Sequence, residues 1–508
     1  MTPNCQPSAP RYPASAAARR RTLAAYWLIA CAGALCGAGF TLVGRPLEGG
    51  GIVVLGLAPL MLHLDAMLMP ELWLGPCSVY YLGHLGAYLI GPLGQLYFLD
   101  SLNFDPETYV LAQWGAAAGL AAFAIFYPLV FRKIFASVAT YRRSHPRPAK
   151  NAGTWKGYAL ILLGLGVAIY YIGFQFGISR LVFTSYYTDV PIGKGTIFNA
   201  FWHTDIASIF LLAFCAGRNR GRWWALWLLA VGALALYTLL EGSRLEIALA
   251  LVVSAGGLHL GGLSKRKIFL SGLIALALFV PAFGIVPAYR ESFSGRRMSM
   301  EDRRGELLLS SNKFLAANRS LADLSRAPLE RMRLETVDAI FAQTPKPLPY
   351  AGFKNMERVL YVWIPQFLWP GRPDLTDHNE IAIEYGVSVP GSTGSFTPPV
   401  GDGYRRFGWT GIVLLFAFIA CCYGLAGGAI WAFRDHREAL ALLAVVTASG
   451  LETGMGTLLN TFYSMLFVFP KYLVFFWLLR ILHDRFWGGP RRALSRQAYS
   501  HKLLAPGV

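Results

Sequence analysis

The amino-acid sequence predicts an all-α membrane protein, a polytopic bundle of about 12 transmembrane helices with one large extracytoplasmic loop. Of the 508 residues, 55% are hydrophobic and only 15% are charged, whereas about 25% of residues are charged in soluble globular proteins. Apolar runs of about 20 residues, the length of a helix that crosses the hydrocarbon core, recur along the chain. A hydrophilic stretch from Tyr289 to Gly408 separates about nine of these runs from about three others.

The expected spans follow from the apolar runs. They cover approximately residues 23–44, 51–69, 77–98, 109–131, 157–177, 197–217, 223–240, 244–263, 267–287, 409–432, 439–459 and 462–482. Prolines interrupt the second and third spans, at Pro59, Pro70, Pro76 and Pro92, so a re-entrant or broken segment is the alternative there. The first run is about 22 residues long and lacks a small-residue cleavage site, which indicates a retained span rather than a secretory signal.

Basic residues set the expected orientation. The formal net charge is +18, and much of the excess lies before the first span, in the loops after the fourth, sixth, eighth and tenth spans, and in the C-terminal tail. In a twelve-span bundle these segments share one side, which the positive-inside rule makes cytoplasmic. The charge then needs no nucleic-acid partner. We expect cytoplasmic basic tails at residues 1–22 and 483–508, transmembrane helices at 23–287 and 409–482, and an extracytoplasmic catalytic loop at 288–408.

Cysteine usage bears on the loop. None of the 7 cysteines lies in it, so no disulfide can hold it, and we expect its order to come from packing on the bundle or from short helices. The sequence contains neither a CxxC pair nor a His/Cys ligand cluster, which argues against a structural zinc site. It also lacks the glycine-rich motifs that bind nucleotides, so we expect no cofactor and no metal.

The loop divides into two halves. In the first, Glu301 to Gln343, apolar residues recur at helical spacing and predict one or two amphipathic helices, lying along the membrane surface or capping the bundle. The second half, Pro345 to Gly408, is rich in proline, glycine and aromatic residues and has little periodicity. Loops of that length are usually functional or disordered, and the aromatic content argues against disorder.

Three motifs carry a resemblance to a known family. Residues 366–373 read QFLWPGRP, residues 401–411 read GDGYRRFGWTG, and residues 242–244 read GSR. In order, spacing and expected side of the membrane they resemble the membrane-embedded polymerases of O-antigen and exopolysaccharide repeat units, the Wzy-like family, which implies a GT-C-like fold. The resemblance touches the last half of the chain. Asp402 stands where the family usually has glutamate, and two arginines stand where a neutral residue and asparagine are more usual.

The resemblance implies a metal-independent glycosyltransferase. The donor would be a sugar chain on a polyprenyl diphosphate, and the acceptor a hydroxyl of another lipid-linked repeat unit. Arginine suits the leaving diphosphate, because its planar fork binds phosphate oxygens in pairs and stays protonated. Arg244 and Arg290, at the expected outer membrane boundary, are therefore the expected catalytic cations. The alternatives are an interfacial anchor or a partner of Glu241 and Glu246 for Arg244, and a plain charge after a helix for Arg290.

The acceptor hydroxyl benefits from a general base, and His378 is the only histidine in the loop. Asp402 competes for this role, unless it only forms a turn in the GDG sequence. For His378 the alternative is a surface residue at the start of a helix capped by Asp377. Ionisable side chains inside a bilayer are energetically costly, so such residues are candidates for function. His203, Asp205, Glu452 and Lys471 are four such residues in the expected spans. The expected substrate-binding residues are Arg372, Tyr404, Arg405, Arg406, His203, Asp205 and Glu452.

Three classes of function stay open. The first is a repeat-unit polymerase of the bacterial inner membrane, whose partners would be the lipid-linked donor and acceptor, membrane lipids and a chain-length regulator. The second is an O-antigen ligase, which shares the loop logic. The third is a transporter or flippase of lipid-linked glycans, which should lack a large patterned loop. The loop motifs favour the polymerase.

Overall fold

The computed structural model describes residues 16–70, 72–98, 104–144, 153–175, 203–219, 221–241, 245–273, 300–316, 335–361, 364, 368–369, 373, 377–389, 397–454 and 456–486. All regular secondary structure in these residues is helical. Among them, seven helices are long and apolar enough to cross a membrane: Arg21–Leu42, Pro46–Leu68, Pro106–Ser144, Trp155–Ile172, Arg222–Leu239, Pro399–Ala432 and Leu458–Arg485. The predicted class, an all-α membrane protein, is confirmed.

The described helices lie both in the expected apolar runs and in the hydrophilic loop. They are α1 (Ala16–Leu42), α2 (Pro46–Gly56), α3 (Ala58–Leu68), α4 (Pro76–Leu85), η1 (Gly86–Ile90), α5 (Gly91–Phe98), α6 (Pro106–Ser144), α7 (Gly153–Gln175), α9 (Thr204–Asn219), α10 (Arg222–Glu241), α11 (Leu245–Leu260), α13 (Met300–Ala316), α15 (Glu335–Gln343), η2 (Met356–Tyr361), α16 (His378–Glu384), α17 (Pro399–Ala432), α18 (Arg437–Gly454), α19 (Leu458–Tyr463), η3 (Ser464–Val468) and α20 (Phe469–Phe486).

The prolines of the second and third expected spans interrupt these spans only locally. Pro59 and Pro76 lie in the first turn of α3 and α4, where a missing N–H leaves no helical bond unmade. Leu57, between α2 and α3, keeps a right-handed helical conformation. Pro92 follows the π-helical turn η1. Both regions are therefore helical runs with a local irregularity.

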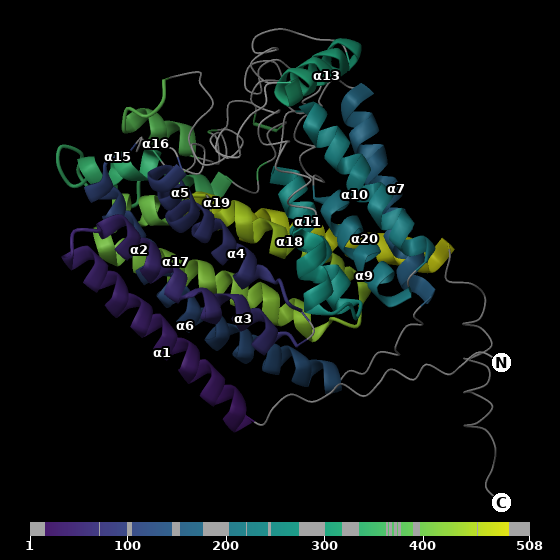
Figure 1. Cartoon of the computed structure of the whole chain (residues 1–508). Helices are drawn as coiled ribbons and strands as arrows, with labels where there is room; N and C mark the ends of the chain where they lie inside the picture. Colours follow the sequence, from purple (N-terminus) through teal and green to yellow (C-terminus); the bar gives the residue numbers. More distant parts are fainter. Residues whose placement is uncertain are drawn as a thin grey trace, which may run out of the picture.

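Helix α18 joins two groups of helices. Figure 1 shows α1, α2, α3, α4, α6 and α17 gathered on one side and α7, α9, α10, α11 and α20 on the other. Helices α6 and α17 have the most extensive contact of any pair of described helices. They pack closely at Gly424, where any side chain would collide with the backbone carbonyl of Tyr127. Small residues at such positions let membrane helices pack tightly. Helix α18 contacts α4 and α17 in one group and α9, α11 and α20 in the other.

One end of the bundle collects basic residues. Arg142, near the end of α6, donates to the carbonyl of Ala432 at 2.7 Å and to Asp435 at 2.8 Å. Arg437, at the start of α18, donates to Asp484 of α20 at 2.6 Å, and Lys156 of α7 lies over the ring of Trp223. Several of the basic segments that the positive-inside argument placed on one side, at the end of α6, between α17 and α18 and at the end of α20, are therefore in contact in this structure.

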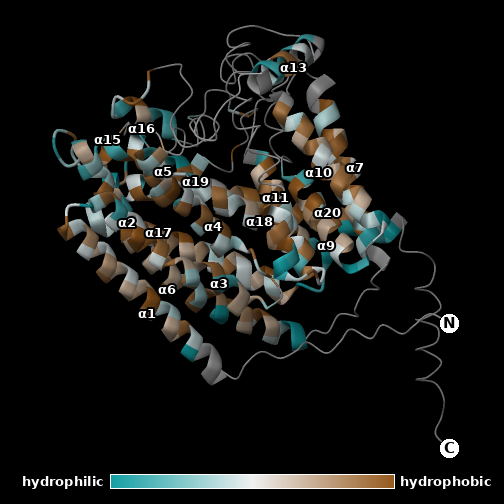
Figure 2. Ribbon diagram, in the orientation of Figure 1, coloured by the Kyte–Doolittle hydropathy of each residue, from teal (hydrophilic) through white to brown (hydrophobic). Residues whose placement is uncertain are grey.

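The opposite end carries α15 and α16, over the ends of α6, α17 and α19 (Figure 1). Figure 2 shows hydrophobic residues along the long helices and hydrophilic residues gathered on α13 and around α15 and α16. In the described part of the first half of the loop lie α13 and α15, where one or two amphipathic helices were predicted. Helix α17 consists of two helices joined by a kink at Phe407 and Gly408: the second follows the predicted span at 409–432, and the first, which begins at Pro399, was not predicted.

Candidate functional site

Helix α15 anchors the loop to the bundle. Its buried residues Val337, Ile340 and Phe341 face the core, and the Phe341 ring stacks on Tyr404 of α17 at 4.0 Å between centroids. Asp338 accepts from the Asp105 amide at 3.2 Å and from the Thr108 hydroxyl, both at the start of α6. Helix α15 is thus fixed both to α17 and to the start of α6.

The first two turns of α17 hold the segment after α15. The amide of Ala351 donates to the carbonyl of Arg405 at 2.9 Å. Arg406 returns the contact, because its Nη1 donates to the carbonyls of Gly352 and Lys354, at 3.0 Å each. Residues that were expected to contact substrate therefore bind the loop backbone itself.

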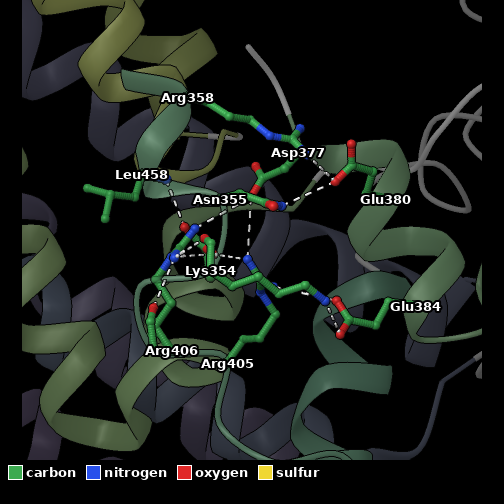
Figure 3. A network of polar contacts seen from close by, with 11 residues as sticks. Lys354, Asn355, Arg358, Asp377, Glu380, Glu384, Arg405, Arg406 and Leu458 are labelled. Carbon is green, nitrogen blue, oxygen red and sulfur yellow. Dashed lines mark hydrogen bonds and ion pairs between the residues drawn. The ribbon is translucent and has the colours of Figure 1, made fainter. Parts of the chain in front are cut away.

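Four buried ionisable residues form a cluster between α16 and the first turns of α17: Asp377, Asp402, Arg405 and Arg406. Figure 3 labels Asp377 and the two arginines. Asp402 Oδ1 accepts from Arg405 Nη2 and from Arg406 Nε, each at 3.0 Å. Asp377 Oδ2 lies 3.4 Å from the Nη2 atoms of both arginines. All four side chains are between 0% and 2% exposed. Two carboxylates balance two guanidinium groups, which is what makes such burial possible.

Outer ion pairs surround this cluster. Arg358 Nη2 lies 2.8 Å from Glu380 Oε2, which also accepts from Asn355 at 3.2 Å. Lys354 Nζ lies 2.7 Å from Glu384, and the same carboxylate lies 3.6 Å from Arg405. These pairs tie the 351–358 segment to α16 (Figure 3). They are partly exposed, so each contributes little stability alone.

His378 lies at the edge of the cluster. It is the first residue of α16, and its Nε2 lies 2.9 Å from Asn460 Nδ2 of α19. Asp402 fixes the start of α19, because its Oδ2 accepts from the Leu458 amide at 2.8 Å. The GDGYRR motif, the DHNE sequence and α19 thus meet at one place, and His378 is half-buried rather than a surface residue.

Burial controls the charge of this imidazole. Desolvation lowers the pKa of His378 below its ordinary value of 6.5, and the negative charge of Asp402 opposes this only in part. His378 is therefore neutral at pH 7, the state in which a histidine accepts a proton. The pKa of Asp377 is raised by its own burial and by the charge of Asp402, against the two arginines.

The structure brings five of the expected site residues together: His378, Asp402, Tyr404, Arg405 and Arg406. Asp402 is helical and fully buried, so it does not form a turn. Arg244, Arg290 and Arg372 lie outside the described residues. Glu452 lies on α18, but its side chain is not among the described ones.

His203 and Asp205 lie apart from this cluster, at the start of α9. Asp205 Oδ2 accepts from the Tyr170 hydroxyl of α7 at 2.7 Å, and the His203 amide donates to the Tyr472 hydroxyl of α20 at 2.6 Å. Lys471 lies over the rings of Phe467 and Tyr472, at 5.1 and 4.9 Å. These groups join α7, α9 and α20.

Two contributors escaped the sequence argument. Asn460 falls at the boundary between the last two expected spans, where nothing marks a polar role. Asp377 was interpreted only as a helix cap, but its side chain makes no capping bond and turns toward the arginines instead. The sequence signal that could have identified Asp377 was the presence of two acidic and two basic residues in adjacent loop motifs, which can pair.

Comparison with known proteins gave no matching family model, no matching curated protein and no matching solved structure. Among the described residues, no group of three or more His, Cys, Asp and Glu side chains could hold a metal ion.

Proposed function

We propose that this chain is a membrane glycosyltransferase that polymerises polyprenyl-diphosphate-linked oligosaccharide repeat units into O-antigen or exopolysaccharide. The observation that carries the proposal is the meeting of the GDGYRR motif and the DHNE sequence around one half-buried histidine. The family resemblance of the motifs gives the reaction class. The geometry supports it with a neutral imidazole at the end of the bundle, next to the buried cluster of two carboxylates and two guanidinium groups.

In the proposed reaction, His378 accepts the proton of the acceptor hydroxyl while its oxygen forms a new bond to the anomeric carbon of the donor. The bond between that carbon and the diphosphate breaks, and polyprenyl diphosphate leaves with the electron pair. Arg244 and Arg290 bind the leaving diphosphate, and Arg372 contributes to substrate binding. A base of this kind supplies about 10² to 10⁴ in rate.

The proposal gives Arg405 and Arg406 a positioning role. Their guanidinium groups already bind two carboxylates, and the guanidinium group of Arg406 also donates to two backbone carbonyls. A diphosphate would have to displace these buried bonds, which is costly. Tyr404, stacked on Phe341, supports the same cluster.

The proposed topology has about 12 crossings and a GT-C-like arrangement in the bacterial inner membrane. Both termini are cytoplasmic, and the α15–α16 end is periplasmic. The grouping of basic turns at the other end supports this orientation. A chain-length regulator is the proposed protein partner.

The test is a gene deletion complemented with wild type or with His378→Ala, followed by gel analysis of the glycans. We expect the deletion and the variant to accumulate single lipid-linked repeat units on the periplasmic face of the membrane and to lose long chains. Gln343→Ala, which removes a contact to the Tyr385 carbonyl away from His378, is the matched control. Single units trapped on the cytoplasmic face would indicate a flippase. Long chains that form but fail to reach lipid A would indicate a ligase.

A further inference from the structure

An open groove lies at the basic end of the bundle, away from α15 and α16. It has a volume of about 370 Å³ and runs between the end of α6, from Phe135 to Arg143, and the turn after α17, from Ala432 to Asp435. Arg142 crosses its inner side, because it donates to the carbonyl of Ala432 at 2.7 Å and to Asp435 at 2.8 Å. The groove is therefore framed by fixed contacts.

The groove forms because α6 extends further than α17. The two helices run in the same direction and stay close up to Gly428, where a side chain would collide with the carbonyl of Phe131. Helix α17 ends one turn later, at Ala432. Helix α6 continues to Ser144, roughly another 13 Å past the level of Ala432. The overhanging part of α6 is one wall, and the turn after α17 is the other.

The groove carries more positive than negative charge, since three arginines and one aspartate line it. Asp435 pairs with Arg142. No carboxylate in the described part of the chain forms an ion pair with Arg143 or Arg434. The Arg434 guanidinium lies 5.2 Å from the centre of the Trp431 ring, so it is folded back over the last turn of α17. Two guanidinium groups without a carboxylate favour an anion, and phosphate oxygens match their planar fork.

The groove lies where the protein leaves the hydrocarbon core. Leu129 of α6 is 60% exposed, and Arg132 and Lys133 are the exposed charges that follow it. Phe135 is about one turn further along, at the depth of lipid headgroups. Apart from its four charged residues, the groove is lined by Phe135, Ala139 and Ala432. A free anion would contact only the arginines, whereas a phospholipid also covers the apolar wall with its glycerol and acyl ends.

The charge of the groove also discriminates among headgroups. Phosphatidylethanolamine would bring an ammonium group close to Arg143 and Arg434, which repel it, whereas phosphatidylglycerol carries only the charge of its phosphate. We propose that this groove binds the headgroup of an anionic phospholipid from the adjacent leaflet. The bound lipid joins α6 to the turn between α17 and α18. This lipid site is independent of the reaction at His378.

The test uses the purified full chain in detergent, titrated with phosphatidylglycerol and, separately, with phosphatidylethanolamine of the same acyl chains. Native mass spectrometry measures the fraction of the protein that carries lipid. We expect saturable binding of phosphatidylglycerol that inorganic phosphate does not displace, and weaker binding of phosphatidylethanolamine. Arg143→Gln with Arg434→Gln should weaken phosphatidylglycerol binding about thirtyfold, the loss expected for two arginines at a membrane surface.

Two control variants separate a built site from general charge. Lys265→Gln with Arg266→Gln removes the same charge from exposed residues after α11 and should bind like wild type. Ala139→Trp fills the groove but keeps its charges, so it should weaken binding, whereas Ala136→Trp, exposed on the same helix outside the groove, should not. Equal binding of phosphatidylethanolamine, displacement by inorganic phosphate, an equal loss in the Lys265 and Arg266 variant, or unchanged binding in Ala139→Trp would overturn the proposal.

Discussion

At the scale of residues, the charge of a side chain did not by itself predict its role. Arg405 and Arg406 stand in a motif expected to bind an anion, and the anions they meet are Asp377 and Asp402 of the same chain. His378 could be chosen from the sequence because it is the only histidine of the loop. Asn460 could not, because its importance depends on the folding of α19 against α16 and no local pattern records that contact.

The His378 imidazole predicts a pH profile. Because burial lowers its pKa below 6.5, the neutral, active form should persist down to that pH, and polymer formation in membranes should fall only at more acidic pH. Asn460→Asp places a negative charge beside the ring and favours its protonated form, so the acid limb should move to higher pH by about one unit.

Asn460→Ala serves as the comparison in the same assay. It removes the contact without adding charge, so it should lower the rate with little movement of the limb. An unchanged acid limb in Asn460→Asp would contradict the proposed role of His378 as the base.

The two buried carboxylates should differ in importance. Asp402 accepts three bonds of 3.0 Å or less, whereas the contacts of Asp377 to the arginines are 3.4 Å. Asp402→Asn should cost about 3–5 kcal/mol of stability, because it leaves a buried cation without its partner. Asp377→Asn should cost less, since burial already disfavours its ionised form. Thermal unfolding in detergent measures both.

A double variant checks the electrostatic cause of this loss. Asp402→Asn with Arg405→Met removes one charge of each sign and should recover part of the stability. Lys354→Met breaks only an exposed pair and should change stability by less than about 1 kcal/mol. If the double variant were less stable than Asp402→Asn, charge imbalance would not be the cause.

At the scale of elements, composition and apolar run length located the long helices well, but not the short helix that precedes the kink of α17. The glycines and aspartate of GDGYRR favour a turn locally, and tertiary contacts to the 351–354 backbone override that preference. The expected boundary at residue 408 coincides with the kink between the two helices of α17, where Phe407 and Gly408 leave helical geometry. Short helices such as α16 carry too few residues for periodicity to reveal them.

Gly408 makes this kink possible. Its φ of 63° and ψ of −148° are accessible essentially to glycine alone, and an added Cβ would lie 3.0 Å from the Tyr350 hydroxyl. Gly408→Ala should therefore destabilise the protein by about 1–3 kcal/mol, measured as a lower melting temperature.

Two further variants isolate the backbone effect at this kink. Gly232→Ala, in α10 with open space around it, should be neutral or slightly stabilising. Tyr350→Phe should not rescue Gly408→Ala, because the strain lies in the backbone. Rescue by that change would place the cost in the side-chain contact instead.

At the scale of the whole molecule, the sequence predicted the class and the grouping of basic turns, because both follow from solvation by lipid and water. It could not predict that α18 joins two groups of helices, or that α6 and the turn after α17 enclose a groove. Those features depend on which helix faces meet, and nearly all faces of such helices are apolar.

The orientation of the whole bundle is testable with single cysteines in a cysteine-free background. Phe353→Cys, 75% exposed beside α16, should react with a membrane-impermeant maleimide in intact spheroplasts. Arg434→Cys, in the turn between α17 and α18, should react only after permeabilisation. The reverse pattern would invert the topology, and labelling of both sites in intact cells would mean that the two ends share one side.

The buried ion cluster also bears on how the protein meets its surroundings. Dissolved ions weaken attraction between exposed charges beyond roughly 8–10 Å. Counterions cannot reach side chains that are at most 2% exposed. The arrangement of the cluster beside His378 should therefore be the same in dilute and in salty media.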